Sequence, residues 1–207
     1  MPRTSPQRLH EIRTRLTQEA ARIMAEEGGR DYRIAKRKAA DRLGIRDAAR
    51  VSPTNREIEQ AVVDHHRLFR AESQPQRLQQ LRQAAKQAMQ LFADFEPRLT
   101  GSVLAGTATL HSSVQLHLFS DVAEQVSLHL MTCEIPHELS EKRLRLLNGD
   151  YRHYPCYGFL AGDVPIEAIV FPFDALRQPP ASPVDGKPMK RASYAEVESL
   201  LSKGRND

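Results

Sequence analysis

The sequence predicts an α+β protein: a helical N-terminal half of about four helices, packed on a small mixed-sheet domain. Up to about residue 95, apolar residues recur every three or four positions, which is typical of amphipathic helices. From residue 96 onward, short alternating stretches are separated by turn residues, which is typical of strands. We therefore expect two domains, a basic helical domain over residues 1–95 and an α+β domain over residues 96–207.

The helices of the first half are predicted from their apolar spacing and their end signals. We expect them over residues 5–27, 31–43, 55–69 and 75–95. Ser5 is the expected N-cap of the first helix, with Pro6 at its first helical position. Gly44 is expected to close the second helix, and Thr54 or Asn55 to cap the third. The residues between Gly44 and Thr54 are expected to form a connection.

The second half is predicted to contain five strands and two longer helices. Alternation places the strands at residues 98–100, 113–119, 134–147, 151–160 and 164–171. Asn148-Gly149-Asp150 predicts a tight hairpin between the third and fourth strands, because Asn-Gly accepts the positive φ that such turns need. One helix is expected over residues 122–131, and Ser193 is expected to cap a final helix over residues 194–203.

The strand at residues 113–119 carries the pattern on which the functional interpretation depends. Its apolar members are Val114, Leu116 and Leu118, and they alternate with Ser113, Gln115 and His117. Side chains at every second position of a strand share one face. We expect the apolar set to face the core and the polar set to lie in a row on one accessible face.

Gly101-Ser102 ends the first expected strand, and after ten intervening residues Ser113-x-Gln115 begins the second. This spacing resembles the signature of the nucleotidyltransferase fold of the polymerase β superfamily. In that signature, Gly-Ser and a similar gap precede Asp-x-Asp on the next strand. Over about residues 96–193 the chain resembles an uncharacterised bacterial nucleotidyltransferase-like family. Ser113 and Gln115 stand where that family has its metal-binding carboxylates.

The resemblance implies an altered catalytic centre. In nucleotidyltransferases, three carboxylates and the substrate phosphates hold two divalent cations. The third carboxylate lies on a later strand beside the Asp-x-Asp strand, and Glu167 is the matching candidate. Mg²⁺ prefers anionic oxygen ligands, which Ser113 and Gln115 do not supply. We therefore assign no metal ligands, and we expect nucleotidyl transfer to be lost or badly weakened.

Phosphate binding is the property that the remaining residues can still support. Backbone amides after Gly101 begin the next helix, and helix N-termini attract anions. Ser102 and Thr107 add hydroxyl groups, and a later loop expected to fold back on the sheet adds three cations: Lys187, Lys190 and Arg191. The leading hypothesis is a nucleotide- or nucleic-acid-binding protein with little or no transferase activity.

An enzyme remains the first alternative. Glu167, together with Asp121 or Asp163, would then rebuild one metal site, and the protein would be an active Mg²⁺-dependent nucleotidyltransferase. Mg²⁺ is expected as a cofactor only under this alternative.

A DNA-binding regulator is the second alternative. A helix, a Gly-rich turn and a short basic helix over residues 31–43 follow the order of a helix-turn-helix motif. The basic residues of that helix are Arg33, Lys36, Arg37 and Lys38. They suit phosphate contacts better than base reading, and a solvated basic face on an ordinary helical hairpin is the plainer interpretation.

Charge and composition limit the partners that the chain can have. Residues 1–100 carry 20 Lys/Arg against 13 Asp/Glu, a net +7, whereas residues 101–207 carry 10 against 13, a net −3. The basic first half permits nucleic-acid binding. The sequence has no apolar run of membrane-spanning length and no secretory signal, so we expect a cytoplasmic protein without a membrane partner. Cys133 and Cys156 are expected to be free thiols.

Overall fold

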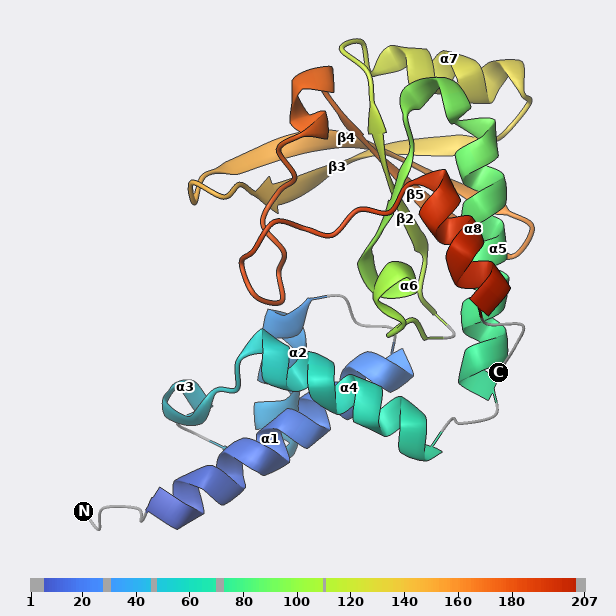
Figure 1. Cartoon of the computed structure of the whole chain (residues 1–207). Helices are drawn as coiled ribbons and strands as arrows, with labels where there is room; N and C mark the ends of the chain where they lie inside the picture. Colours follow the sequence, from blue (N-terminus) through green and yellow to red (C-terminus); the bar gives the residue numbers. More distant parts are fainter. Residues whose placement is uncertain (1–5, 28–30, 46–47, 70–72, 110, 204–207) are drawn as a thin grey trace. The chain divides into compact units, whose positions relative to one another are not determined.

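The computed structural model describes residues 6–27, 31–45, 48–69, 73–109 and 111–203. These residues form eight α-helices and one five-stranded mixed sheet, so the protein is of the α+β class (Figure 1). Its N-terminal half is helical and its C-terminal half contains the sheet. In the described part of the chain, no helix has the length and apolar character needed to cross a membrane.

Backbone contacts divide the chain into two compact units. One consists of residues 1–74 with 109–111, and the other of residues 75–108 with 112–207. We call them the helical unit and the sheet unit. The helix predicted over residues 75–95 belongs to the sheet unit by this division.

The helical unit is built around its longest helix. Its helices are α1 (Pro6–Glu27), α2 (Tyr32–Arg42), α3 (Ala48–Val51) and α4 (Asn55–Phe69). α1 contacts both α2 and α4. Three of the predicted helices are thereby confirmed, whereas α3 is a short helix within the stretch predicted as a connection. The predicted cap Ser5 lies outside the described residues.

Both ends of α2 follow from its sequence. The Asp31 side chain accepts hydrogen bonds from the backbone N–H groups of Arg33 and Ile34, at 2.7 and 3.2 Å. These bonds satisfy two donors that the first helical turn leaves unpaired. At the other end, Gly44 has a φ of +65°. The N–H of Ile45 then reaches the Ala40 carbonyl at 3.0 Å, as in a Schellman motif.

The N-terminus of α4 is held by a capping box. Thr54 donates to the Glu57 carboxylate through its backbone N–H at 2.6 Å and its hydroxyl at 2.7 Å. Arg13 of α1 donates two hydrogen bonds to the same carboxylate, at 3.0 and 2.6 Å. The Arg13 guanidinium and the Thr54 donors together lower the pKa of Glu57 to about 2. One side chain therefore caps α4 and joins it to α1.

The sheet unit contains five strands in the order β1-β2-β5-β4-β3. The strands are β1 (Arg98–Thr100), β2 (Val114–Phe119), β3 (His137–Arg145), β4 (Tyr151–Ala161) and β5 (Val164–Phe171). The pairing of β2 with β5 is parallel, and the other pairings are antiparallel. The predicted strands are confirmed, as is the hairpin at Asn148-Gly149, where Gly149 has a φ of +96°.

Helices cover one face of this sheet, which we call the helix face. They are α5 (Ser73–Leu91), α7 (Glu124–Thr132) and α8 (Tyr194–Lys203). The sheet unit also has three short helical elements: η1 (Ala93–Phe95), α6 (Gly101–Ala105) and η2 (Phe173–Leu176). Val114, Leu116 and Leu118 of β2 are buried in one apolar cluster with residues of all three covering helices. The predicted apolar face of β2 is confirmed.

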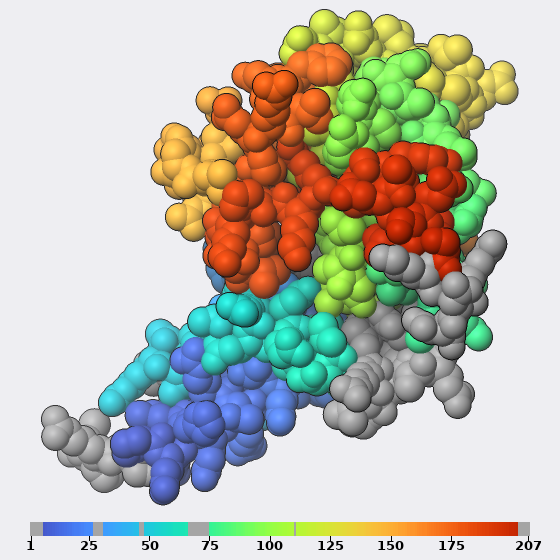
Figure 2. Space-filling model, viewed as in Figure 1, coloured from blue at the N-terminus to red at the C-terminus, as the bar shows by residue number. Residues whose placement is uncertain are grey.

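The opposite face carries the odd-numbered residues of β2, and we call it the strap face. The C-terminal strap, residues 172–191, folds back over part of it and shows as the orange segment on the surface in Figure 2. Beneath it lies a second cluster that includes Phe119, Tyr154 and Phe171, with Ala175 and Leu176 of η2 packed against it. The prediction of an accessible polar row was therefore wrong for His117 and Ser113, which are 1% and 3% exposed.

Candidate functional site

Three polar side chains meet on the strap face, where Gln115, Glu167 and Lys142 form what we call the Glu167 cluster. Strand register sets Gln115 directly beside Glu167 on the parallel pair β2–β5. The Gln115 amide donates to Glu167 Oε2 at 3.2 Å, and the Lys142 ammonium donates to Glu167 Oε1 at 3.2 Å. Both oxygens of the single carboxylate at this position are thus engaged within the protein.

Lys142 reaches Glu167 from the edge strand β3. Register places Lys142 opposite Tyr154 on β4, and Tyr154 packs in the strap-face cluster. Gly158 is the β4 residue that pairs with Glu167. Because Lys142 pairs with Tyr154 and Glu167 pairs with Gly158, the lysine reaches the carboxylate diagonally across β4. Side-chain exposures of 35% for Lys142 and 19% for Glu167 place the ion pair at a half-buried, accessible position.

The Gly101 turn borders this cluster. Thr100 of β1 pairs with Gln115 of β2, and Gly101 follows with a φ of +71°. A Cβ atom at Gly101 would collide with the Gln115 side-chain oxygen. Glycine is therefore required here both by the backbone conformation and by the close approach of Gln115.

The phosphate-binding candidates beside this turn differ in accessibility. Ser102 is half-buried, whereas Thr107 is only 7% exposed and its backbone N–H bonds to the Ser102 carbonyl at 2.9 Å. α6 is five residues long. A helix that short carries little of the aligned dipole that attracts anions to longer helices. Of these two residues, Ser102 is therefore the more accessible to a phosphate.

Ser113 occupies the first of the two predicted carboxylate positions. It is buried, and its hydroxyl has no hydrogen-bond partner among the described residues. A buried hydroxyl without a partner costs free energy. Of the pair Ser113 and Gln115, only Ser113 has a side chain without a hydrogen-bond partner among the described residues.

The covered part of the strap face contains a pair formed by buried His117 and half-buried Arg191. Arg191 Nε donates to His117 Nδ1 at 2.9 Å, which fixes the neutral His117 tautomer with its proton on Nε2. Arg191 also donates to the carbonyl oxygens of Ala175 and Leu176, at 2.8 and 3.2 Å. Burial, with a smaller contribution from Arg191, lowers the pKa of His117 well below its ordinary value. Burial also lowers the pKa of Arg191 to about 10.

The other predicted site residues are distributed more widely. Lys187 and Lys190 are exposed, whereas Arg191 of the same loop points inward to His117. Asp121 accepts a hydrogen bond from the Phe173 backbone N–H at 3.1 Å, beyond the far end of β2 from Gln115. Asp163 lies in the β4–β5 turn, 4.0 Å from Arg77. Both aspartates lie outside the strands that carry the Glu167 cluster.

The basic residues of α2 lie on its outer side within the helical unit. Arg33, Arg37 and Lys38 are exposed, and Lys36 is half-buried. Desolvation by burial lowers the pKa of Lys36, with Glu57 and Arg13 nearby. Arg33 and Arg37 are one helical turn apart, so they share a face.

The Glu167 cluster does not fit a pair of magnesium ions. Mg²⁺ is bound by oxygen atoms in octahedral geometry, preferably anionic ones. The cluster offers one carboxylate that already holds a cation, and the Gln115 atom facing that carboxylate is a nitrogen. Among the residues that the structure describes, no group of three or more His, Cys, Asp or Glu side chains is arranged to hold a metal.

Two members of this region were missed by sequence reasoning. Lys142 lies 25 positions from Glu167, and no local motif joins them. Glu138 stands across Gly158 from Glu167 on β3, so it shares the strap face. The register of the β3–β4 hairpin would have revealed both, because the Asn148-Gly149 turn sets which β3 residues face which β4 residues.

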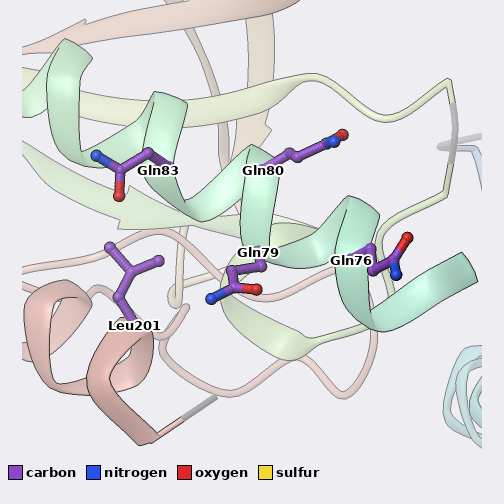
Figure 3. A pocket seen from close by; sticks show the side chains of 5 residues that line it. All are labelled: Gln76, Gln79, Gln80, Gln83 and Leu201. Atoms are coloured by element: carbon purple, nitrogen blue, oxygen red, sulfur yellow. The ribbon is translucent and has the colours of Figure 1, made fainter. Parts of the chain in front are cut away.

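A separate groove of about 440 Å³ lies between α5 and α8, shown in Figure 3. Its lining is Gln76, Gln79, Gln80, Gln83 and Leu201. The amides lie along one side of α5, and none of these residues belongs to the Glu167 cluster. The groove is neutral and polar, so it lacks the cations that a phosphate site needs.

Comparisons with known proteins do not identify this region. The chain matches no protein-family model, no curated protein and no solved structure. Its function is therefore inferred from the geometry of the described residues and from the resemblance of the segment Gly101 to Gln115.

Proposed function

We propose that the sheet unit is a degenerate nucleotidyltransferase domain that binds a nucleotide or nucleic acid and has little or no transferase activity. The observation that carries this proposal is the Glu167 cluster. Glu167 stands beside Gln115 on the neighbouring strand, where the family resemblance puts a third carboxylate, and Gln115 and Lys142 engage both of its oxygens. Nucleotidyl transfer needs metal ions to stabilise charge on the phosphates, and this donor set is unsuited to them.

The arrangement around the cluster supports binding rather than transfer. Gly101 follows β1 and lies against the Gln115 side chain, so the turn borders the cluster. Lys142 contributes an accessible cation, and its three N–H donors exceed the one that Glu167 uses. A phosphate at this surface would find a cation and the hydroxyl of Ser102 without a metal.

Calorimetric titration of ATP, GTP, CTP and UTP, each with and without Mg²⁺, tests the proposal. We expect binding of at least one nucleotide, with an affinity that Mg²⁺ does not raise. Lys142→Met should weaken that binding. Lys86→Met, which removes a lysine from the ion pair with Glu198 outside the cluster, should leave it unchanged. Absence of binding for all nucleotides and for single-stranded oligonucleotides would contradict the proposal.

The alternative, an active enzyme, can be tested with the same protein and with variants of its carboxylates. Mg²⁺-dependent release of pyrophosphate from a nucleotide, abolished by Glu167→Gln, would favour an active nucleotidyltransferase. Glu138 is the carboxylate that shares the strap face with Glu167. Glu138→Gln would then also lower the rate, because a metal site with two protein carboxylates needs both.

DNA binding by the helical unit is the second candidate, favoured by the exposed Arg33 and Arg37 on one face of α2. Binding through phosphate contacts weakens steeply with salt. The variant Arg33→Gln/Arg37→Gln should then lower affinity for duplex DNA and flatten the salt dependence. The matched control is Arg15→Gln, an exposed arginine on α1. DNA binding that ignores the α2 charges would reject this candidate.

A further inference from the structure

Lys142 lies where a cation bound by Glu167 would lie. Its ammonium is 3.2 Å from Glu167 Oε1, and the pair is half-buried. A second cation approaching the same carboxylate would meet the positive charge of Lys142 at close range. Like charges that near repel strongly, most of all where water is partly excluded.

The Gln115 amide is oriented against metal binding as well. Its nitrogen donates to Glu167 Oε2, and its oxygen, the only atom that could bind a hard cation, lies against Gly101. Turning the amide over would bring its oxygen against the Glu167 oxygen, which is an unfavourable contact between two acceptors. The glutamine thus presents no ligand toward the carboxylate.

We propose that Lys142 replaces the divalent cation at Glu167, so that the site excludes magnesium and takes phosphate groups that carry no metal. The exclusion of metal rests on the cluster alone. The phosphate ligand rests on the proposed function above. The ligand class is a nucleotide or other phosphate ester in its metal-free form, held by a fixed ammonium instead of a bound ion.

Titration of the 207-residue chain with Mn²⁺ alone tests the exclusion, with free Mn²⁺ followed by electron paramagnetic resonance. The wild type is expected to bind no Mn²⁺ at millimolar concentrations. The variant Gln115→Asp/Lys142→Met removes the ammonium and adds a carboxylate. It should bind Mn²⁺ at least tenfold more tightly than any site of the wild type does. Lys86→Met, at the separate ion pair with Glu198, is the matched control and should behave as the wild type does.

Two results would overturn the inference. One is Mn²⁺ binding by the wild type as tight as by Gln115→Asp/Lys142→Met. The other is a double variant that is folded, by circular dichroism and thermal unfolding, and yet binds no better than the wild type. In either case Lys142 is not what keeps the metal away from Glu167.

Nucleotide titration in EDTA separates this inference from the proposed function. Binding by the wild type in EDTA that falls at least tenfold in Lys142→Met supports both. Binding that requires Mg²⁺ would support nucleotide binding but would contradict the proposal that Lys142 takes the place of the metal. No nucleotide binding in any condition would reject the proposed function and the phosphate ligand, while the Mn²⁺ experiment would still decide whether Lys142 excludes metal.

Discussion

The two faces of the sheet are formed by alternate residues of the same strands, but they differ in how many polar side chains they hold in contact. On the helix face, Leu116 and its neighbours are fully buried in apolar side chains. On the strap face, Gln115 and His117 of the same strand make specific polar contacts with Glu167 and Arg191. The helix face can be satisfied by any well-packed apolar set, whereas each polar residue of the strap face needs a particular partner.

This difference assigns stability mainly to one face and function to the other. Burial of apolar area is the dominant favourable term in folding. Polar groups that are partly buried and bonded only to each other contribute little net stability. We therefore expect substitutions on the helix face to unfold the sheet unit, and substitutions at the Glu167 cluster to change binding first.

Leu116→Ala should give the largest loss of stability. Leu116 is 0% exposed within the main core. Truncation of a buried leucine costs about 2–5 kcal/mol, from lost apolar contact and from the cavity left behind. Urea unfolding of the sheet unit measures the change. Leu160→Ala is the control, since Leu160 is 65% exposed. Equal losses for both variants would contradict the assignment of stability to the helix face.

Gly101→Ala should give a smaller loss that reports the contact with the Glu167 cluster. An L-residue with left-handed φ costs about 1–2 kcal/mol, and the added Cβ would also push Gln115 away from Glu167. Gly162→Ala is the matched control, because Gly162 has a φ of +64° and no atom within 4 Å of its added Cβ.

The difference between these two glycine variants isolates the collision with Gln115. We expect Gly101→Ala to be less stable than Gly162→Ala by about 1 kcal/mol, the size of a lost hydrogen bond. In a Gln115→Ala background that difference should vanish. If it persists there, the close approach of Gln115 is not what demands glycine at residue 101.

His117 should make the stability of the sheet unit fall as the pH drops. Its ordinary pKa of 6.5 applies in the unfolded chain, and burial lowers the pKa in the folded protein. The unfolded state therefore binds the extra proton, and stability is complete above about pH 6.5 and is lost progressively below it, by up to about 1.4 kcal/mol per pH unit.

Chemical unfolding between pH 7 and pH 5 measures this loss as the difference between the wild type and His117→Asn. Carboxylates with lowered pKa values, such as Glu196, lose their contribution only below about pH 4.3, so they do not overlap this window. Identical slopes for the two proteins would show that His117 does not stay neutral in the folded state.

The fold was predictable because local signals and tertiary packing agree. β1, β5 and α8 have the predicted limits. Turn and capping residues define their ends, and between the ends the apolar residues recur at the spacing of a strand or of a helix. α3 was missed because its four residues give no periodic pattern. The predicted domain boundary near residue 96 stays a prediction.

The candidate site was predictable only in part, because it depends on contacts between distant strands. Gly101 and Gln115 were found from the spacing of the Gly-Ser signature, and Glu167 was the candidate that the family resemblance implied. The structure brings Gln115 and Glu167 together. Lys142 was not found, because its contact with Glu167 depends on the register of a hairpin. The burial of His117 was also missed, since alternation shows that a residue faces away from one core but not that a distant strap covers it.

Ser193→Ala should give the smallest of these effects, and it returns to the helix face. The Ser193 hydroxyl and backbone N–H both donate to Glu196 at 2.7 Å, and the box caps α8, whose Val197 is buried in the main core. Loss of such a cap costs about 1 kcal/mol. Ser199→Ala, an exposed change within α8, should cost nothing measurable, because alanine is the better helix former. A Ser193→Ala loss matching that of Leu116→Ala would mean that α8 forms only with its cap, and that the apolar contact of Val197 does not hold the helix on the sheet.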